Sequence, residues 1–281
     1  MVLVMRIIVF IAVLFTCQTL CMANAFSANT EEHLEKESHN AEPFTQWLVE
    51  LREDAISQGI STQTLNNAFD NIELINKVIS LDRKQPEAKI TLEEYLEKTV
   101  IDSRIKNGQN ELIENKELLN NISKKYSVPS NVIVALWGME TSYGENVGNF
   151  KIISALTTLA YDGRRSDFFR GELINALKIM EAEKISVDDF QGSWAGAFGQ
   201  CQFMPSSFLK YAVDFDGDGK RDIWYTQADV FASIANYLHS EGWNPDEGIE
   251  EGGNNFKVLL KWNRSRYFAT AIGKLVEAIR G

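Results

Sequence analysis

The segment between Pro129 and Gly144 constrains the fold more than any other part of the chain. Residues 132–137 (VIVALW) are apolar on nearly every face of a helix, and Pro129-Ser130 is typical of a helix start with Ser130 as the N-cap. A helix without a polar face has to be covered by other elements on all sides. The sequence therefore predicts a buried central helix that ends shortly before Gly144.

The elements around this helix are expected to be helices as well. Apolar residues recur at helical spacing in four stripes, namely Phe44, Leu48 and Leu51; Leu112, Leu119, Ile122 and Tyr126; Phe169, Leu173, Leu177 and Met180; and Phe231, Ile234, Ala235 and Leu238. Strand signals are few: residues 256–262 alternate and predict one short strand or extended segment, followed by a last helix from near Ser265. We expect a mainly α fold with a helical region at 44–120, a core at 121–245 and a segment at 246–281 that packs on it.

Charge and cysteine content exclude several classes of function. The chain has 28 basic and 39 acidic residues and a formal net charge of -11, so it lacks the basic surface that a nucleic-acid partner requires. Three Cys and three scattered His are too few for a Cys/His zinc site or a disulfide framework.

The first 25 residues are typical of a removable signal peptide. Arg6 precedes an apolar run from Ile7 to Leu14, and Ala23-Asn24-Ala25 fits the small-residue cleavage rule. A membrane anchor and a lipoprotein acylated at Cys17 are the alternatives. We expect export to the periplasm and a flexible segment at 26–43. Cleavage would leave Cys201 as the sole thiol, which its apolar neighbours predict to be buried.

One carboxylate follows the apolar run directly. Glu140 is expected at the C-terminal end of the buried helix, just before a glycine that can open a turn. Desolvation and the negative end of the helix dipole both disfavour its ionised form, so Glu140 should keep its proton to higher pH than a free glutamate. A protonated carboxyl group is a general acid. The structural alternative is an ordinary surface glutamate at a helix end.

Six short motifs in order surround Glu140 and extend beyond it. They are Gly138-Met139-Glu140-Thr141-x-x-Gly144, Ala155-Leu156-x-Thr158-Leu159-Ala160-Tyr161, Arg164-Arg165, Gly192-Ser193-x-Ala195-Gly196-Ala197, Gln202-Phe203-Met204-Pro205-Ser206-Ser207-Phe208 and Ser233-x-Ala235-Asn236-Tyr237-Leu238. Together with residues 82–87 and 263–267, they resemble the membrane-bound lytic murein transglycosylase B family, and the resemblance covers essentially the whole chain after residue 25.

The resemblance implies a lysozyme-like helical catalytic core with flanking helical elements. It also implies cleavage of peptidoglycan between N-acetylmuramic acid and N-acetylglucosamine, ending in a 1,6-anhydro sugar. The position of Glu140 matches the single glutamate that serves this family as acid and then as base. One carboxylate suffices because the substrate's acetamido group can stabilise the oxocarbenium-like centre and its 6-hydroxyl replaces water. No cofactor is required, and the expected partners are glycan strands and other cell-wall proteins, with the chain a monomer.

Ordinary lysozyme chemistry would need a second acid, with the two carboxylates about 5–9.5 Å apart. Glu145 and Asp162 are the candidates near Glu140 in sequence, and we interpret both as solvated loop charges. A hydrolytic muramidase and a non-catalytic wall-binding protein therefore remain as alternatives to a lytic transglycosylase.

The remaining matched residues suit a glycan groove. Gln202 and Ser193 can exchange hydrogen bonds with an acetamido group, and Phe203 and Tyr237 can stack on sugar faces. The cations Arg164 and Arg165 can bind substrate carboxylates. Core packing is the alternative for Phe203, and a solvated turn is the alternative for the two arginines. The resemblance alone assigns Asn263, Tyr267 and an aromatic residue at Trp262.

An acidic run follows the catalytic motifs and has the spacing of a calcium-binding EF-hand loop over 214–225. Its expected ligands are Asp214, Asp216, Asp218, the backbone of Lys220, Asp222 and, in place of the missing glutamate at loop position 12, Asp229. The alternative is a turn whose aspartates cap their own backbone. Any bound calcium is expected to be structural, because Glu140 needs no metal.

Overall fold

The computed structural model describes residues 43–84, 90–162 and 165–280. The chain forms two compact units, which meet between Gln58 and Gly59 in sequence. The expected signal peptide, nearly all of the expected flexible segment, and Arg164 lie outside the described residues. Within the described residues, no helix combines the length and the apolar character needed to cross a membrane.

The described part of the first unit is one helix, residues 43–57. The second unit is mainly helical, as predicted, and contains α2 (Thr62–Phe69), α3 (Asn76–Arg83), α4 (Leu92–Thr99), α5 (Asp102–Glu114), α6 (Lys116–Tyr126), α7 (Ser130–Thr141), α8 (Ile152–Tyr161), α9 (Ser166–Glu183), α10 (Pro205–Tyr211), α11 (Gln227–Ser240), α12 (Asn254–Trp262) and α13 (Arg266–Arg280). The expected boundary between residues 120 and 121 lies inside α6.

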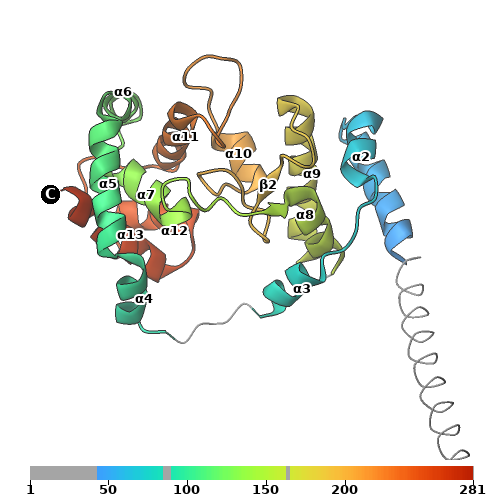
Figure 1. Cartoon of the computed structure of the whole chain (residues 1–281), viewed down its shortest axis with the longest axis horizontal. Helices are drawn as coiled ribbons and strands as arrows, with labels where there is room; N and C mark the ends of the chain where they lie inside the picture. Colours follow the sequence, from blue (N-terminus) through green and yellow to red (C-terminus); the bar gives the residue numbers. More distant parts are fainter. Residues whose placement is uncertain (1–42, 85–89, 163–164, 281) are drawn as a thin grey trace, which may run out of the picture. The chain divides into compact units, whose positions relative to one another are not determined.

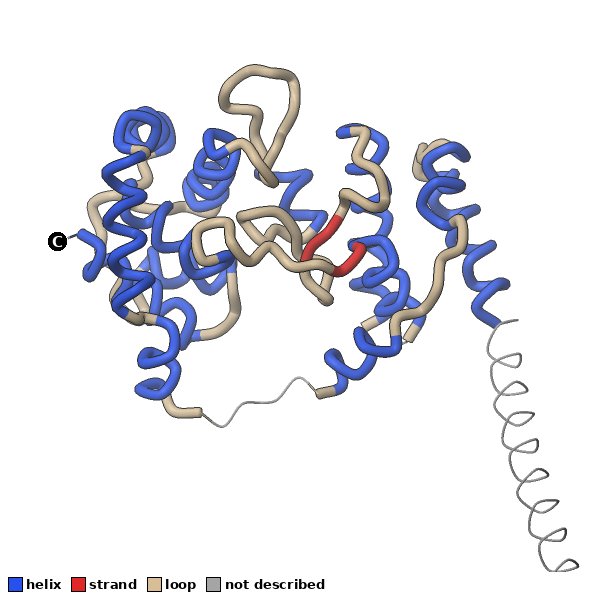
Figure 2. Tube along the Cα trace, viewed as in Figure 1, coloured by secondary structure: helices blue, strands red, loops and turns tan. Residues whose placement is uncertain are grey.

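The β structure of the described residues is small (Figure 2). Strands β1 (Phe150–Lys151) and β2 (Gln191–Gly192) pair antiparallel, with Phe150 opposite Gly192. This ladder holds the chain that leaves α7 against the loop that precedes α10. The approach is close, because a Cβ atom at Gly148 would lie 2.2 Å from the carbonyl oxygen of Gly192.

Helix α7 is the buried centre that its sequence predicts. It packs against α5, α6, α11 and α13 (Figure 1). Residues 132–138 are all buried. Its first residue is Ser130, but the N-cap is Pro129 and no side chain caps the helix. The prediction of Ser130 as the N-cap was therefore wrong, because proline supplies the extended backbone at this position.

The second group of helices is centred on α9, which packs against α2, α8 and α10. The predicted stripe of α9 is buried, as is the stripe of α11. Glu172 of α9 is also buried, and its two carboxylate oxygens accept hydrogen bonds from the N–H (2.8 Å) and the hydroxyl (2.6 Å) of Ser206. One buried carboxylate thereby fixes the start of α10 on α9.

The predicted strand at residues 256–262 was wrong, because this segment is α12. Asn255, Val258, Leu259 and Trp262 follow the i, i+3, i+4, i+7 spacing of a helix, but the polar Asn255 hid the stripe. Asn255 is buried and fully bonded, since its amide group donates to the carbonyls of Asn244 and Glu247 and accepts from the Asn244 N–H. The last helix begins after Ser265, as predicted, and the Ser265 hydroxyl accepts from the Phe268 N–H.

We predict that Glu172→Gln lowers the free energy of unfolding by about 1–3 kcal/mol. The NH₂ group of the glutamine would replace one of the two acceptor oxygens, so either the N–H or the hydroxyl of Ser206 would lose its acceptor. Glu97→Gln, at an exposed position of α4, is the matched control and should change stability by less than about 0.5 kcal/mol. Denaturant unfolding of the two variants measures the difference. Equal stabilities would show that the Glu172–Ser206 contact does not stabilise the fold.

Candidate active site

Glu140 lies at the end of α7, one residue before its last residue. Helix α7 is buried, whereas Glu140, near its end, is only half-buried as a residue. The carboxylate accepts a hydrogen bond from the indole N–H of Trp262 at 2.7 Å. The candidate acid thus stands between a buried helix and an aromatic residue of α12.

The turn after α7 fixes the backbone of Glu140. Ser142, Tyr143 and Gly144 all have left-handed backbone conformation, with φ values of 51°, 63° and 88°. A non-glycine residue in this region costs about 1–2 kcal/mol, so other contacts have to hold the turn. The Thr141 hydroxyl accepts from the Gly144 N–H (3.0 Å) and donates to the Gln200 carbonyl (3.1 Å). The turn is therefore anchored to the loop that carries the other matched residues.

Tyr143 folds back over α7 and locks this turn. Its ring lies 5.3 Å from that of Trp137, and its hydroxyl donates to the Arg104 carbonyl of α5 at 2.7 Å. A Cβ atom at Gly138 would lie 2.4 Å from the tyrosine ring. The glycine of the Gly138-Met139-Glu140 motif is therefore required for space, two residues before the acid.

Burial sets the protonation of Glu140. Loss of water around the carboxyl group raises its pKa to about 7, and the hydrogen bond from Trp262 lowers it in part. Among the described residues, no lysine or arginine forms an ion pair with Glu140. The expected upward shift of the pKa is confirmed, with desolvation as its largest cause, and a carboxyl group with this pKa can give up and take back a proton near neutral pH.

Two further groups lie close enough to respond to the charge of Glu140. The pKa of Tyr95, on α4, is raised by burial and then by Glu140, and Arg104 lowers it. The thiol of Cys201 is buried, as predicted, and its pKa is raised well above its usual value by burial and by Glu140. Both groups are therefore neutral at the pH at which Glu140 titrates.

The structure brings Gln202 and Ser193 into the loop next to this turn. The Gln202 amide donates to the Val147 and Gly199 carbonyls, both at 3.0 Å, so its nitrogen is used inside the protein. The Ser193 hydroxyl accepts from the Ala197 N–H at 3.0 Å. Both residues are half-buried. The groups that can still form hydrogen bonds with a ligand are the side-chain oxygen of Gln202 and the hydroxyl proton of Ser193.

The predicted aromatic residues lie beneath Trp262. Phe203 is 2% exposed and lies 5.4 Å from the ring of Trp262, so it cannot present a face to a sugar. The prediction that Phe203 stacks on substrate was wrong, and the alternative of core packing is what the structure contains. Tyr237 is 6% exposed and packs edge-on against Trp262 at 4.6 Å. Its ring faces are covered, which also argues against direct stacking on a sugar.

The other matched residues have different surroundings. Arg165 is an exposed turn residue, in line with the alternative of a solvated turn, but its guanidinium group pairs with the buried Asp82 at 2.7 Å. The side-chain oxygen of Asn263 (Oδ1) accepts a hydrogen bond from the Ser265 N–H, and Asn263 thereby lies in the link between α12 and α13. Tyr267 is exposed, and its ring lies 5.9 Å from that of Tyr95. Tyr267 is thus a matched aromatic residue that is exposed, next to the Tyr95 ring.

The two candidates for a second carboxylate have different surroundings. Glu145 is exposed, as predicted. Asp162 was expected to be solvated, but its side chain is 9% exposed and pairs with Arg83 at 2.6 Å, so that prediction was wrong. The pair holds Asp162 at the end of α8, where it stabilises the packing of α3 on α8.

The acidic loop gathers three of the predicted metal ligands. Carboxylate oxygens of Asp214, Asp216 and Asp229 lie within 4.8 Å of one another. Asp218 and Asp222 lie outside this cluster, and their carboxylates accept hydrogen bonds from backbone N–H groups two or three residues later in the chain. Asp229 is buried, and its pKa is raised. Burial is the largest cause, and the charges of Asp216 and Asp214 add to it, while two backbone N–H donors act in the opposite direction.

Sequence reasoning missed two residues that surround Glu140. Trp262 was expected only as an aromatic residue of the groove, yet it donates the hydrogen bond to the acid across 122 positions of sequence. Tyr95 carried no signal at all, because it lies on a short amphipathic helix far from the motifs. Contacts of this length leave no periodic pattern in a single sequence.

Known proteins resemble this chain over most of its described length. The sequence model of the Transglycosylase SLT domain family matches residues 43–252. Membrane-bound lytic murein transglycosylase B of Escherichia coli (strain K12) is 38% identical over 150 residues, which are 53% of this chain and 41% of that protein. The chain therefore matches less than half the length of this relative.

Solved structures of lytic transglycosylases have the same fold. SltB3 from Pseudomonas aeruginosa, in complex with NAG-anhNAM-pentapeptide, superposes with a TM-score of 0.80 at 33% identity, over 85% of this chain and 80% of that chain. The Escherichia coli lytic transglycosylase Slt35 in complex with calcium superposes with a TM-score of 0.75 at 26% identity, over 85% and 93%. These likenesses confirm the predicted fold class, a lysozyme-like helical core with little β structure.

We predict that Trp262→Phe raises the pKa of Glu140 above about 7, because the variant keeps the ring but removes the N–H that stabilises the carboxylate. A hydrogen bond to a charged group corresponds to a shift of roughly one to two pH units. A ¹³C NMR titration of the Glu140 carboxyl carbon, assigned with Glu140→Gln, measures it. Trp243→Phe is the control, because the buried indole N–H of Trp243 has no hydrogen-bond partner among the described residues. An unchanged titration in Trp262→Phe would contradict the role given to the indole.

Proposed function

Because the chain belongs to the Transglycosylase SLT domain family, we propose that it is a lytic transglycosylase of peptidoglycan. It cleaves the glycosidic bond between N-acetylmuramic acid and N-acetylglucosamine and leaves a 1,6-anhydro sugar. The observation that carries this proposal is Glu140, a single carboxyl group with a pKa of about 7 at the end of a buried helix. Its environment suits a group that must act as an acid and as a base in turn.

In the first step, protonated Glu140 donates its proton to the glycosidic oxygen as the bond to the anomeric carbon breaks. Because burial raises the pKa of Glu140 to about 7, Glu140 is protonated in a large fraction of the molecules near neutral pH, which supports this role. Positive charge develops on the sugar, and the substrate's own acetamido group can stabilise it. No second protein carboxylate is needed for this step.

In the second step, ionised Glu140 takes the proton from the 6-hydroxyl of the same sugar. That oxygen closes on the anomeric carbon and forms the anhydro ring, so no water enters the product. The Trp262 indole N–H, 2.7 Å from the carboxylate, stabilises the ionised form between the two steps. The protein therefore balances two opposed needs at one side chain, proton retention by burial and proton release by one hydrogen bond.

We infer that the substrate lies along the loop residues Ser193 and Gln202 and the exposed ring of Tyr267. The Gln202 carbonyl oxygen and the Ser193 hydroxyl suit the N–H and carbonyl groups of an acetamido substituent. The bound NAG-anhNAM-pentapeptide of SltB3 supports this class of ligand for the present chain. We include Asn263 among the substrate-binding residues, since it is the C-cap of α12 and directly follows Trp262.

We also propose a structural calcium ion at the acidic loop. The residues present fit such an ion, because three carboxylates lie within 4.8 Å of one another and hard oxygen ligands are those that calcium prefers. Asp229 lies beyond the loop at 214–225 but belongs to this group of three carboxylates, in the role that the sequence analysis gave it as the substitute for the missing glutamate. Bound calcium would offset the mutual repulsion of these groups and fix the loop against α11, where Asp229 lies.

Export of the chain to the periplasm is the third proposal. It is supported by the signal-like pattern of residues 1–25 and by the location of peptidoglycan outside the inner membrane. The partners that this implies are glycan strands and other proteins of the cell wall.

We predict that Glu140→Gln lowers turnover of purified peptidoglycan by about 10²–10⁴-fold or more, because the amide cannot deliver the proton. Mass spectrometry of the products tests the reaction itself. Anhydro-muropeptides, lighter than hydrolysed muropeptides by one water, are expected from the wild type. Hydrolysed products would indicate a muramidase, and digestion by Glu140→Gln at the wild-type rate would exclude Glu140 as the acid.

The same variant should be more stable than the wild type at pH 8. The pKa of Glu140 is about 7 in the fold against an ordinary value of 4.5, so the folded state binds more protons and loses stability as pH rises from about 4.5 to 7. Glutamine removes this loss. The melting temperature of Glu140→Gln should exceed that of the wild type at pH 8 and equal it at pH 4, which separates lost chemistry from lost folding.

For the calcium site, we expect calcium in excess of its dissociation constant to raise the melting temperature by mass action, corresponding to about 2.7 kcal/mol at a hundredfold excess. Asp216→Asn should weaken this rise, because the asparagine keeps an acceptor for the Asp218 N–H but removes a charge from the cluster. Asp246→Asn, at an exposed position outside the loop, is the control. Identical melting curves with calcium and with a chelator would exclude the site.

A further inference from the structure

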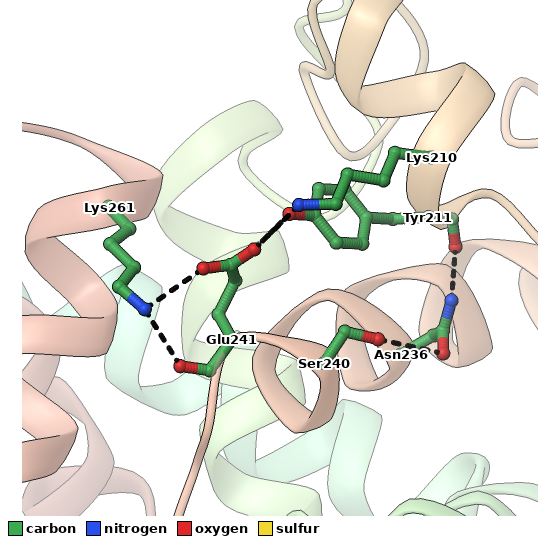
Figure 3. A network of polar contacts seen from close by, with 6 residues as sticks. All are labelled: Lys210, Tyr211, Asn236, Ser240, Glu241 and Lys261. Atoms are coloured by element: carbon green, nitrogen blue, oxygen red, sulfur yellow. Dashed lines mark hydrogen bonds and ion pairs between the residues drawn. The ribbon is translucent and has the colours of Figure 1, made fainter.

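Glu241, the C-cap of α11, joins three helices through one carboxylate (Figure 3). Its Oε1 accepts hydrogen bonds from the Tyr211 hydroxyl and from Lys210 Nζ (3.0 Å), both on α10. Its Oε2 lies 3.0 Å from Lys261 Nζ on α12, and the same ammonium group donates to the Glu241 carbonyl at 3.1 Å. The carboxylate side chain is only 16% exposed. A single anion thus ties α10 and α12 to the end of α11.

This carboxylate stays ionised. The Tyr211 hydroxyl, Lys261 and Lys210 hold the pKa of Glu241 at about 2. Several donors on one mostly buried carboxylate bind more strongly than an isolated ion pair at the surface. The contacts of Glu241 are therefore complete at every pH at which Glu140 titrates.

Two routes lead from Glu241 to Trp262. Lys261 directly precedes Trp262 at the end of α12. On the second route, the ring of Tyr211 lies 4.4 Å from that of Tyr237, which lies 4.6 Å from that of Trp262. The Glu241 N–H also donates to the Tyr237 carbonyl at 3.0 Å. Glu241 is thus connected to Trp262 both through the backbone of α12 and through the rings of Tyr211 and Tyr237.

Helix α10 has a second attachment that does not involve Glu241. The Asn236 amide donates to the Tyr211 carbonyl at 2.9 Å, and its carbonyl oxygen accepts from the Ser240 hydroxyl at 3.4 Å (Figure 3). The backbone of Tyr211 is therefore held on α11 without its hydroxyl group. Removal of that hydroxyl should disturb the contact to Glu241 and leave α10 in place.

We propose that Glu241 is a positioning residue for the catalytic acid, which holds the Trp262 indole N–H on the Glu140 carboxylate. Glu241 itself touches neither Glu140 nor, on this proposal, the substrate. The proposal rests on the proposed function for its effect on turnover, whereas its effect on the proton affinity of Glu140 is a property of the protein alone. A loosened indole would donate a longer hydrogen bond and stabilise the carboxylate less.

The groups around both carboxylates allow a clear measurement. Trp262, Tyr95 and Cys201 face Glu140, and Arg104 lies near Tyr95. Lys210, Tyr211, Lys261 and Tyr237 face Glu241, and burial raises the pKa of both tyrosines. Among these groups, only Glu140 changes its charge between pH 5 and 8.

The experiment is a ¹³C NMR titration of the Glu140 carboxyl carbon in the full chain, with the Trp262 indole N–H signal followed in parallel. In Glu241→Gln we expect the pKa of Glu140 to rise by roughly one pH unit, towards its value in Trp262→Phe, and the indole signal to lose part of its pH dependence. Tyr211→Phe should cause a smaller change of the same sign. Glu277→Gln removes an exposed carboxylate paired with Lys274 and should change neither signal.

The sign of the shift distinguishes positioning from a direct charge effect. Loss of the negative charge of Glu241 would by itself lower the pKa of Glu140, because one repulsive charge is removed. Positioning through Trp262 predicts the opposite direction. Tyr211→Phe changes no charge, so any rise that it causes comes from the altered geometry.

An unchanged or lowered pKa of Glu140 in folded Glu241→Gln would overturn the proposal. If Glu241→Gln does not fold, Tyr211→Phe decides, and wild-type signals in that variant would overturn it. The products of the wild type test the proposed function separately. If the Glu140 titration shifts in the variants but the wild type releases no anhydro-muropeptides, the positioning role is supported and the proposed reaction is refuted. If the titration does not shift but anhydro-muropeptides are released, the reaction is supported and the positioning role is refuted.

Discussion

The burial of α7 is the constraint on which the rest of the structure depends. Its apolar residues are covered by α5, α6, α11 and α13, so the chain on both sides of α7 in sequence supplies the cover that this helix needs. The same burial carries Glu140 into a poorly hydrated position at the helix end. The left-handed turn at Ser142 and Tyr143 then directs the chain to the loop of Ser193 and Gln202. Core packing and acid chemistry therefore have one origin.

The helical fold and the acid could be predicted because both depend on local patterns. An apolar helix followed by a carboxylate is visible in fifteen residues, and the buried stripes of α9 and α11 repeat at helical spacing. The failed strand at α12 shows the limit of this reasoning. A buried, hydrogen-bonded Asn255 occupies a position of the helical face that an apolar residue would have revealed.

The errors at the site share a different cause, which is pairing between distant residues. Arg165 resembled a ligand for substrate carboxylates, yet Asp82, 83 positions earlier, neutralises it. Asp162 resembled a solvated charge, yet Arg83 pairs with it across 79 positions. Both pairs join α3 to the segment between α8 and α9. A single sequence shows which residues carry charge, but only the fold shows which charges meet.

The proton affinity of Glu140 is a compromise between stability and chemistry. Holding an ionised carboxylate in a site that raises its pKa from 4.5 to about 7 destabilises the fold by on the order of 3 kcal/mol at high pH, an upper value because the residue is only half-buried. Without the Trp262 indole, the proton would be held still more tightly and would leave less readily in the first step of the proposed reaction. At Glu241, a tyrosine and two lysines hold the pKa at about 2, and a carboxyl group in such surroundings keeps no proton at neutral pH. One donor on a buried carboxyl group lies between these limits, which is where a residue that serves as both acid and base has to lie.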